Sequence, residues 1–271
     1  MLPSPQQMSV QRCSEALAET DWSRALASID LSAARLLKHT ADTTVVRAQL
    51  NLGGSRSCIL KTQRLGGLWN AIRCRLGATR LDRQWKGAQL LQRAKAMPTA
   101  ECLALLRWKA GDGRTFLTLI MEDLPGRTLL EHMASPPEPR TRRLLAQAVG
   151  AQTRGLLKAH LFNRDHKPSN LIVTSMDPAG DQPPTLALVD TVGIGDAGAR
   201  AIEPIRPLTS LMLEPMGCNV TPRLADRMRT LRAFEPDRDT RRKLWKRIDA
   251  AIKAHGDPTP KDNPLGDRPL G

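Results

Sequence analysis

The sequence predicts an α+β protein of two lobes, with a β-rich N-terminal lobe and a mainly helical C-terminal lobe. Short strand patterns concentrate before residue 121, and long amphipathic helical patterns follow it. Between them, the stretch Glu122–Gly126 breaks the apolar pattern with two acidic residues, a proline and a glycine. We therefore expect four segments: an N-terminal extension at 1–30, an N-terminal lobe at 31–121, a C-terminal lobe at 122–255, and a disordered tail at 256–271.

Charge and composition limit the classes of partner. The 271 residues include 41 Lys and Arg against 27 Asp and Glu, for a net charge of +14. Such a surface favours phosphates, anionic lipid headgroups or nucleic acid. Aromatic residues make up only 3% and tyrosine is absent, which argues against a base-stacking platform, so no nucleic acid partner is expected.

The N-terminus and the cysteines indicate a cytoplasmic protein. The first residues lack a basic segment followed by an apolar core, so we predict no signal peptide. No apolar run reaches the 18 residues of a membrane span. The five cysteines are odd in number and have no metal-binding spacing, which favours reduced thiols.

Strand patterns define the N-terminal lobe. Three of them come first, at 32–40, 43–52 and 57–63, and two more follow at 97–108 and 114–121. The basic stretch 64–96 between these groups has helical spacing. In the C-terminal lobe, the pattern predicts a long amphipathic helix at 140–160 and two basic helices at 221–234 and 241–254.

One motif carries the chemistry. Asp165 and Asn170 are five positions apart, between the long helix and an apolar strand at 171–173, and Asp190 follows a second apolar run and precedes Thr191-Val192-Gly193. This is the spacing of the D-x-x-x-x-N catalytic loop of protein kinases, with Asp190 in the place of the D-F-G aspartate.

The residue types suit phosphoryl transfer. Mg²⁺ prefers hard oxygen ligands, which the amide of Asn170 and the carboxylate of Asp190 supply. The carboxylate of Asp165 can orient a hydroxyl and take its proton. Lys167, two residues after Asp165, adds a cation where negative charge builds on the moving phosphoryl group.

The protein-kinase pattern also predicts other positions of the nucleotide site. Lys61 ends the third strand, in the place of the lysine that grips the α- and β-phosphates. By helical register Gln84 stands where kinases place the glutamate that pairs with this lysine, and its amide can hydrogen-bond Lys61 without a counter-charge. Adenine would bind to backbone at Glu122 and Leu124. The loop 38–43, which would cover the phosphates, contains no glycine.

The stretches NRDHKPSNLIV and LVDTVG, with ILKTQRLGGLWNAIRCRLG and the basic helix pair, resemble the lipopolysaccharide kinase family over residues 40–255. The resemblance implies a protein-kinase-like fold that uses ATP and Mg²⁺. It also implies phosphorylation of a sugar hydroxyl of a lipopolysaccharide core or similar lipid-linked saccharide. The protein would then work at the cytoplasmic face of the inner membrane, and its basic helices would contact anionic lipid.

Two other functions stay open. The Lys167-Pro168 pair favours a protein Ser/Thr kinase, although no clear A-P-E segment follows Gly193. A pseudokinase or basic scaffold without turnover is favoured by Gln84 and by the glycine-free loop. A D-x-x-x-x-N spacing also occurs by chance, so the motif is a hypothesis until its structural context is known.

Overall fold

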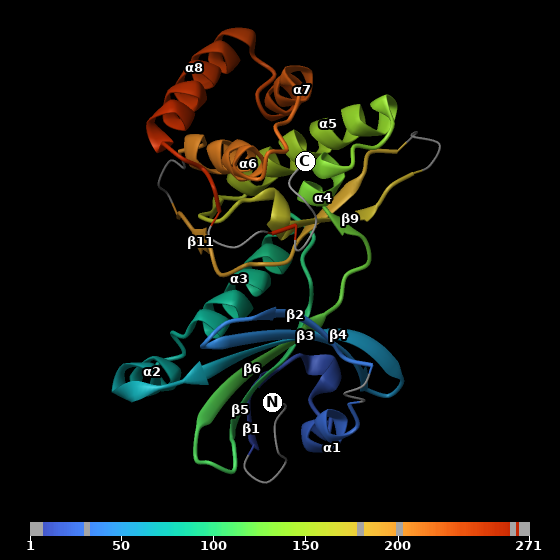
Figure 1. Ribbon diagram of the computed structural model, residues 1–271, viewed down its shortest axis with the longest axis vertical. Helices are drawn as coiled ribbons and strands as arrows, with labels where there is room; N and C mark the ends of the chain where they lie inside the picture. The colour runs from blue at the N-terminus through green and yellow to red at the C-terminus, as the bar shows by residue number, and fades with distance from the viewer. Residues whose placement is uncertain (1–7, 30–32, 178–181, 199–202, 261–263, 266–271) are drawn as a thin grey trace. The chain divides into compact units, whose positions relative to one another are not determined.

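The chain divides into two compact units (Figure 1). The computed structural model describes residues 8–29, 33–177, 182–198, 203–260 and 264–265. The N-terminal unit comprises Met1–Ala88 and Ala100–Asp123, and the C-terminal unit comprises Gln89–Thr99 and Leu124–Gly271. The break after Asp123 falls within the stretch where the sequence loses its apolar pattern.

An antiparallel sheet forms the N-terminal unit. Among the described residues it has six strands in the order β1-β5-β6-β4-β3-β2. Their bounds are β1 (Met8–Cys13), β2 (Arg35–His39), β3 (Thr43–Asn51), β4 (Ser55–Leu65), β5 (Cys102–Lys109) and β6 (Thr115–Glu122). In β4, Cys58, Leu60 and Thr62 are buried and their neighbours are more exposed, as expected for a strand with one covered face. The strands predicted at 43–52, 57–63 and 114–121 are therefore confirmed, with small shifts at their ends.

Three α-helices accompany this sheet in the described residues: α1 (Trp22–Ala27), α2 (Gly67–Arg75) and α3 (Arg80–Ala94). The short 3-10 turn η2 (Glu15–Leu17) precedes α1. The helical stretch predicted at 64–96 thus consists of two helices, with Gly77 at positive φ between them. Leu81, Trp85, Ala88 and Leu91 of α3 are all buried, which confirms the core face that their spacing predicts.

The described residues 8–29 of the predicted N-terminal extension are ordered and belong to the N-terminal unit. β1 pairs antiparallel with β5, and Trp22 and Leu26 of α1 are buried with Leu103 and Leu106. The sequence MSVQRC gave no clear strand signal because β1 is an edge strand whose side chains are half-buried or exposed.

The C-terminal unit is mainly helical. Its helices are α4 (Leu129–Ala134), α5 (Pro139–Lys158), α6 (Ile205–Gly217), α7 (Leu224–Phe234) and α8 (Arg238–His255). Short strands form two small sheets, β10-β9-β7 and β11-β8. Their bounds are β7 (Arg127–Thr128), β8 (Leu161–Asn163), β9 (Leu171–Ser175), β10 (Thr185–Leu188) and β11 (Ile194–Asp196), and η3 (Pro168–Asn170) precedes β9. The buried core joins α5, α6 and α8 to the strands through Leu156, Leu211, Ile248, Leu171 and Leu188.

Part of the segment predicted as a disordered tail is packed. Leu265 is 9% exposed and lies against Leu130 and Cys218. Gly217 at the end of α6 lies so close to the Pro258 carbonyl that a Cβ there would collide with it. Residues 261–263 and 266–271 of the predicted tail lie outside the described residues.

Two further predictions concern thiols and membrane spans. All five cysteines lie in the described part of the chain and are free. Burial raises the pKa of Cys58 to about 11 and that of Cys102 to about 12, so both stay protonated at neutral pH. None of the helices in the described ranges is both long and apolar enough to cross a bilayer.

Candidate active site

The loop of the D-x-x-x-x-N motif lies between two short strands. α5 ends at Lys158, β8 follows, and the loop leads through η3 into β9. β8 pairs with β11, so Asn163 is opposite Ile194. β9 pairs with β10, so Leu171 is opposite Leu188. Both ends of the loop are therefore held by the strands that flank Asp190.

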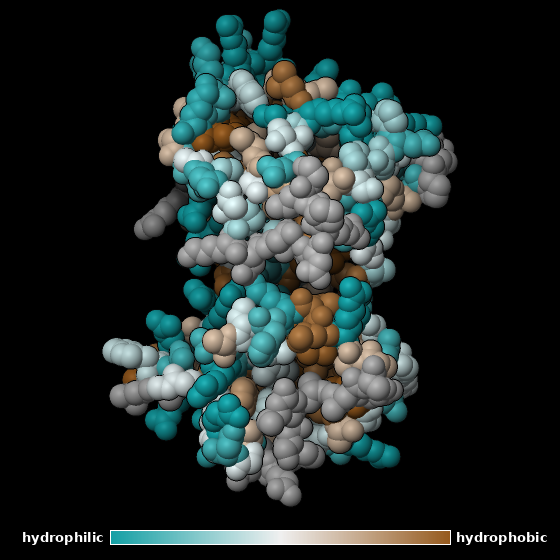
Figure 2. All heavy atoms as spheres, viewed as in Figure 1, coloured by the Kyte–Doolittle hydropathy of each residue, from teal (hydrophilic) through white to brown (hydrophobic). Residues whose placement is uncertain are grey.

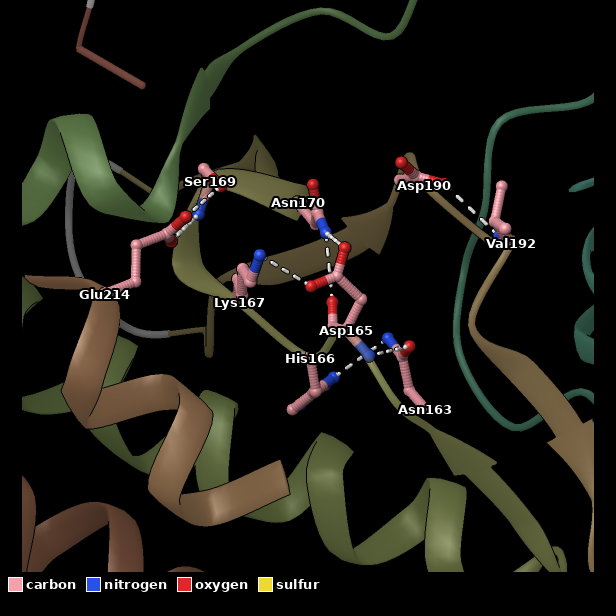
Figure 3. Close-up of polar contacts among 9 residues, drawn as sticks. All are labelled: Asn163, Asp165, His166, Lys167, Ser169, Asn170, Asp190, Val192 and Glu214. Atoms are coloured by element: carbon pink, nitrogen blue, oxygen red, sulfur yellow. Dashed lines mark hydrogen bonds and ion pairs between the residues drawn. The ribbon is translucent and has the colours of Figure 1, made fainter. Parts of the chain in front are cut away.

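Asp165, Asn170 and Asp190 lie close together (Figure 3). The Asn170 side-chain amide donates to the Asp165 carbonyl at 3.0 Å and to its carboxylate at 3.4 Å. The backbone N–H of Val189 donates to the Asn170 carbonyl at 3.0 Å, and Asp190 lies two residues beyond Leu188, where the β9–β10 ladder ends. The Asp190 carboxylate accepts the Val192 N–H at 3.2 Å. Backbone pairing thus brings Asp190 close to Asp165 and Asn170, from which it is distant in sequence.

These contacts fix the orientation of the Asn170 amide. Because its nitrogen donates to Asp165, its oxygen points away from that residue. In Figure 3 this oxygen lies on the same side of the loop as the Asp190 carboxylate. One amide oxygen and one carboxylate facing a common side are a donor set that suits Mg²⁺. In the described residues, no group of three or more His, Cys, Asp or Glu forms a metal-binding cluster.

Lys167 forms an ion pair with Asp165, the predicted base. Its Nζ lies 2.7 Å from an Asp165 carboxylate oxygen, and both side chains are about two-fifths exposed, at 44% and 40%. Burial alone would lower the pKa of Lys167. The hydrogen bond to Asp165 and the charges of Asp165, Glu214 and Asp190 outweigh this effect and raise the pKa. The lysine is therefore a cation at neutral pH, in contact with the carboxylate that would receive a proton.

A buried polar cluster supports the loop from below. Asn163 accepts the Asp165 N–H at 3.0 Å through its side-chain oxygen, and its amide nitrogen lies 3.4 Å from His166 Nδ1. His166 Nε2 lies 3.0 Å from the hydroxyl of Thr153 on α5. Burial lowers the pKa of His166 to about 4, so the ring is neutral at neutral pH. Asn163 thus braces the loop from the position at which protein kinases carry the histidine of H-R-D.

Gly193, which immediately precedes β11, packs against the loop that carries Asp165. Its carbonyl accepts the Arg164 N–H at 3.1 Å. A Cβ at this position would lie 2.7 Å from the Asn163 side-chain oxygen and 3.0 Å from the Asp165 nitrogen. The first distance is shorter than side chains tolerate and the second is tight, so glycine lets the segment after Asp190 approach the loop this closely.

Glu214 of α6 holds the second half of the loop. Its carboxylate accepts the Ser169 N–H at 2.8 Å and the Ser169 hydroxyl at 2.5 Å. Burial raises the pKa of Glu214, and the two hydrogen bonds from Ser169 partly oppose that effect. Because Ser169 adjoins Asn170, this contact fixes the backbone of a predicted metal ligand. The sequence analysis missed Glu214, and no motif could have found it, since it lies 45 residues away.

In the N-terminal unit, the predicted partner of Lys61 is in place. Lys61 lies in β4 between Val45 of β3 and Leu119 of β6, and its Nζ donates to the Gln84 side-chain oxygen at 3.2 Å. Gln84 is 1% exposed, and its nitrogen approaches the Met121 sulfur at 3.0 Å. The helical register read from the sequence therefore located this amide correctly. Asp82 instead pairs with Thr79 and Arg12.

The predicted adenine-binding stretch adjoins the break between the units. The Glu122 N–H already donates to the Glu101 carbonyl at 2.9 Å, so an adenine contact at Glu122 would use its carbonyl oxygen. Leu124 is the first residue of the C-terminal unit in this stretch. Asp123, which the sequence analysis did not single out, ties the stretch to the sheet through Arg47 at 2.9 Å and the Ser57 hydroxyl at 2.7 Å.

Comparison with known proteins identifies the fold. No model of a known protein family matches the sequence, and neither does any curated protein. Among solved structures, WaaP in complex with acyl carrier protein matches with a TM-score of 0.58 over 81% of this chain and 88% of WaaP. The chain has the WaaP fold. Sequence identity to WaaP is 17%, so the likeness is one of structure. It confirms the predicted kinase-like α+β fold, with its β-rich N-terminal and helical C-terminal portions.

Proposed function

We propose that this chain is a kinase that transfers the γ-phosphoryl group of ATP to a sugar hydroxyl of a lipopolysaccharide core or a similar lipid-linked saccharide. The meeting of Asp165, Asn170 and Asp190 around the β9–β10 hairpin carries the proposal. Two comparisons support the reaction class and acceptor: the resemblance of the sequence motifs to lipopolysaccharide kinases, and the shared fold with WaaP, a core heptose kinase of lipopolysaccharide.

Each residue has a distinct role in this proposal. Asp165 orients the acceptor hydroxyl and takes its proton as the hydroxyl oxygen bonds to the γ-phosphorus and the bond to ADP breaks. Lys167 lies against Asp165 and stabilises the charge on the transferred group. Lys61 binds the α- and β-phosphates. Asn170 and Asp190 would hold Mg²⁺, which neutralises phosphate charge when bound.

Labelled ATP tests this proposal. We expect the purified chain to transfer label from ATP to a lipopolysaccharide acceptor in the presence of Mg²⁺. Asp165→Asn should lower kcat by at least about 100-fold, because general base catalysis contributes a factor of that order. Transfer by Asp165→Asn at the wild-type rate would refute the assigned role. Transfer of label to protein substrates alone would show that the chain is a protein kinase and not a saccharide kinase.

A scaffold without turnover is the second candidate, and the Lys61–Gln84 contact favours it. The Gln84 amide offers Lys61 a hydrogen bond but no charge, whereas active protein kinases carry a glutamate at this position. Thermal unfolding with millimolar Mg²⁺-ATP separates the two functions. A kinase is stabilised by its nucleotide, whereas a scaffold that does not bind ATP unfolds at the same temperature with and without it.

A further inference from the structure

One face of α2 exposes apolar side chains beside arginines. Trp69 is 76% exposed, Ile72 is 37% exposed and Leu76, at the end of the helix, is 73% exposed. Their spacing of three and four residues places them on one side of the helix. Cys74, on the opposite side, is buried. The helix therefore turns its apolar stripe outward and has its covered side towards the N-terminal unit.

The charges around this stripe have one sign. Arg73 and Arg75 are exposed and lie on either side of the stripe, and the stretch from Arg64 to Leu81 contains no acidic residue. The first acidic residue after it, Asp82, is 4% exposed and is engaged with Thr79 and Arg12. Exposed apolar side chains flanked by arginine are the pattern of helices that lie in a membrane interface, where tryptophan is also enriched.

The ends of α2 suit such a surface element. It begins at Gly67 with Gly66 as its N-cap, and a Cβ at either position would meet nothing within 4 Å, so the start of the helix is open. Its C-terminal turn is fixed to α3, because Lys86 Nζ donates to the Gly77 carbonyl at 2.7 Å. The helix is thus anchored to the unit at one end, and its apolar side chains project into solvent.

The basic helix α8 lacks this combination. Its apolar residues Leu244 and Ile248 are buried, and Trp245 packs against the core of the C-terminal unit. Figure 2 shows long hydrophilic side chains over α8, at the top of the view. A helix that is only basic binds anionic lipid through electrostatic attraction, which salt screens. A basic helix with exposed apolar side chains can also insert them into the lipid and so bury apolar surface.

We propose that α2, through Trp69, Ile72, Leu76, Arg73 and Arg75, is the element that docks this protein on an anionic lipid surface. The docking assigns a location to the membrane contact that the sequence analysis placed on the C-terminal basic helices. It does not depend on the proposed kinase activity, because vesicle binding is measured without nucleotide or acceptor. A soluble acidic protein would be attracted by the same arginines and is the rival partner.

Vesicle co-sedimentation tests the docking. Wild-type protein should bind phosphatidylcholine vesicles that contain phosphatidylglycerol and should bind pure phosphatidylcholine weakly. The double variant Trp69→Ala/Leu76→Ala should bind the anionic vesicles at least about tenfold less tightly, because it loses two large insertable side chains. The matched control is Leu224→Ala/Met228→Ala, which removes two exposed apolar side chains from the basic helix α7. It should bind as wild type does.

Tryptophan fluorescence gives a second readout. Trp22, Trp85 and Trp108 are at most 4% exposed and Trp245 is partly buried against the C-terminal core, so Trp69 is the most exposed of the five tryptophans and the one whose surroundings should change on docking. We expect a blue shift on anionic vesicles and quenching by brominated lipid, and both should be absent in Trp69→Phe. The proposal would be overturned if the α2 variant bound vesicles as tightly as wild type, or if the α7 control lost more binding than the α2 variant. An unchanged fluorescence spectrum on vesicles would also overturn it, as would binding of an acidic protein without binding of vesicles.

Two charge-reversal double variants distinguish docking through α2 from general electrostatic attraction to the lipid. Arg73→Glu/Arg75→Glu and Arg242→Glu/Lys246→Glu change the net charge equally, and all four positions are exposed. If α2 is the docking element, the first pair should weaken vesicle binding much more than the second. Equal losses would show that overall charge governs the association and would contradict a localised surface.

Discussion

Gly193→Ala tests the packing that joins Asp190 to the catalytic loop. The added Cβ would lie 2.7 Å from the Asn163 side-chain oxygen, and Asn163 is 2% exposed and cannot swing into solvent. The methyl must displace this side chain and so break its hydrogen bond to the Asp165 N–H. Overpacking costs about 1–3 kcal/mol and a lost hydrogen bond about 1 kcal/mol, so we expect a loss of about 2–4 kcal/mol in the free energy of unfolding.

Urea denaturation followed by circular dichroism measures this loss, and ATP turnover measures the displacement of Asp165. Gly111→Ala is the control, because a Cβ there meets nothing within 4 Å and its φ is not positive. The double variant Gly193→Ala/Asn163→Ala should be less destabilised than the sum of the two single variants, since the truncation makes room for the methyl. A Gly193→Ala protein as stable and active as the Gly111→Ala control would refute the reasoning.

Three further predictions follow from the same contacts. Gln84→Glu should give Lys61 a counter-charge at its existing 3.2 Å contact and raise kcat/KM for ATP several-fold; a decrease in steady-state assays would count against Lys61 as the phosphate ligand. Glu214→Gln should lower kcat about tenfold with little change in KM for ATP, because the loop loses a charged acceptor of two Ser169 hydrogen bonds; thermal melting should show that the variant is folded, and an unchanged kcat would count against this role. The pKa of His166 is about 4 in the folded chain, against 6.5 for an exposed histidine. The free energy of unfolding should therefore fall by about 3 kcal/mol as pH falls from 6.5 to 4, and His166→Gln should abolish this pH dependence.

The sign of the His166 effect follows from proton binding. Between pH 4 and 6.5 the unfolded chain binds a proton that the buried ring does not, so acid favours unfolding. The stabilising contribution is complete above pH 6.5 and decreases as pH falls towards 4. A His166→Gln variant with the same acid sensitivity as wild type would assign the slope to other groups.

Much of the site could be predicted from the sequence because the residues that define it are close together in the chain. The six residues from Asp165 to Asn170 set the loop, and the apolar runs after Asn170 and before Asp190 predicted two strands, which pair as β9 and β10. Gln84 could be placed because a helix has a fixed register, and the structure places its oxygen within reach of Lys61. The functional roles of these residues remain predictions for experiment.

The rest depends on contacts between distant segments. Glu214 and Thr153 reach the loop from α6 and α5, and a single sequence offers no pattern for such pairs. The buried neutral state of His166 was likewise unreadable, since histidine occurs both in cores and on surfaces. The pairing of β1 and the packing of Leu265 could not be predicted, because a short edge strand and a single anchoring side chain leave little periodicity.

Metal-dependent nucleotide binding tests the central claim most directly. Calorimetric titration of ATP with and without Mg²⁺ should show that the ion tightens binding to the wild-type chain, and that Asn170→Ala and Asp190→Ala each reduce this gain by at least about tenfold. Asp165→Asn should retain the gain, since it is assigned to the hydroxyl. If Mg²⁺ tightens ATP binding equally in wild type and in the Asn170 and Asp190 variants, these two oxygens do not hold the ion, and the account is contradicted.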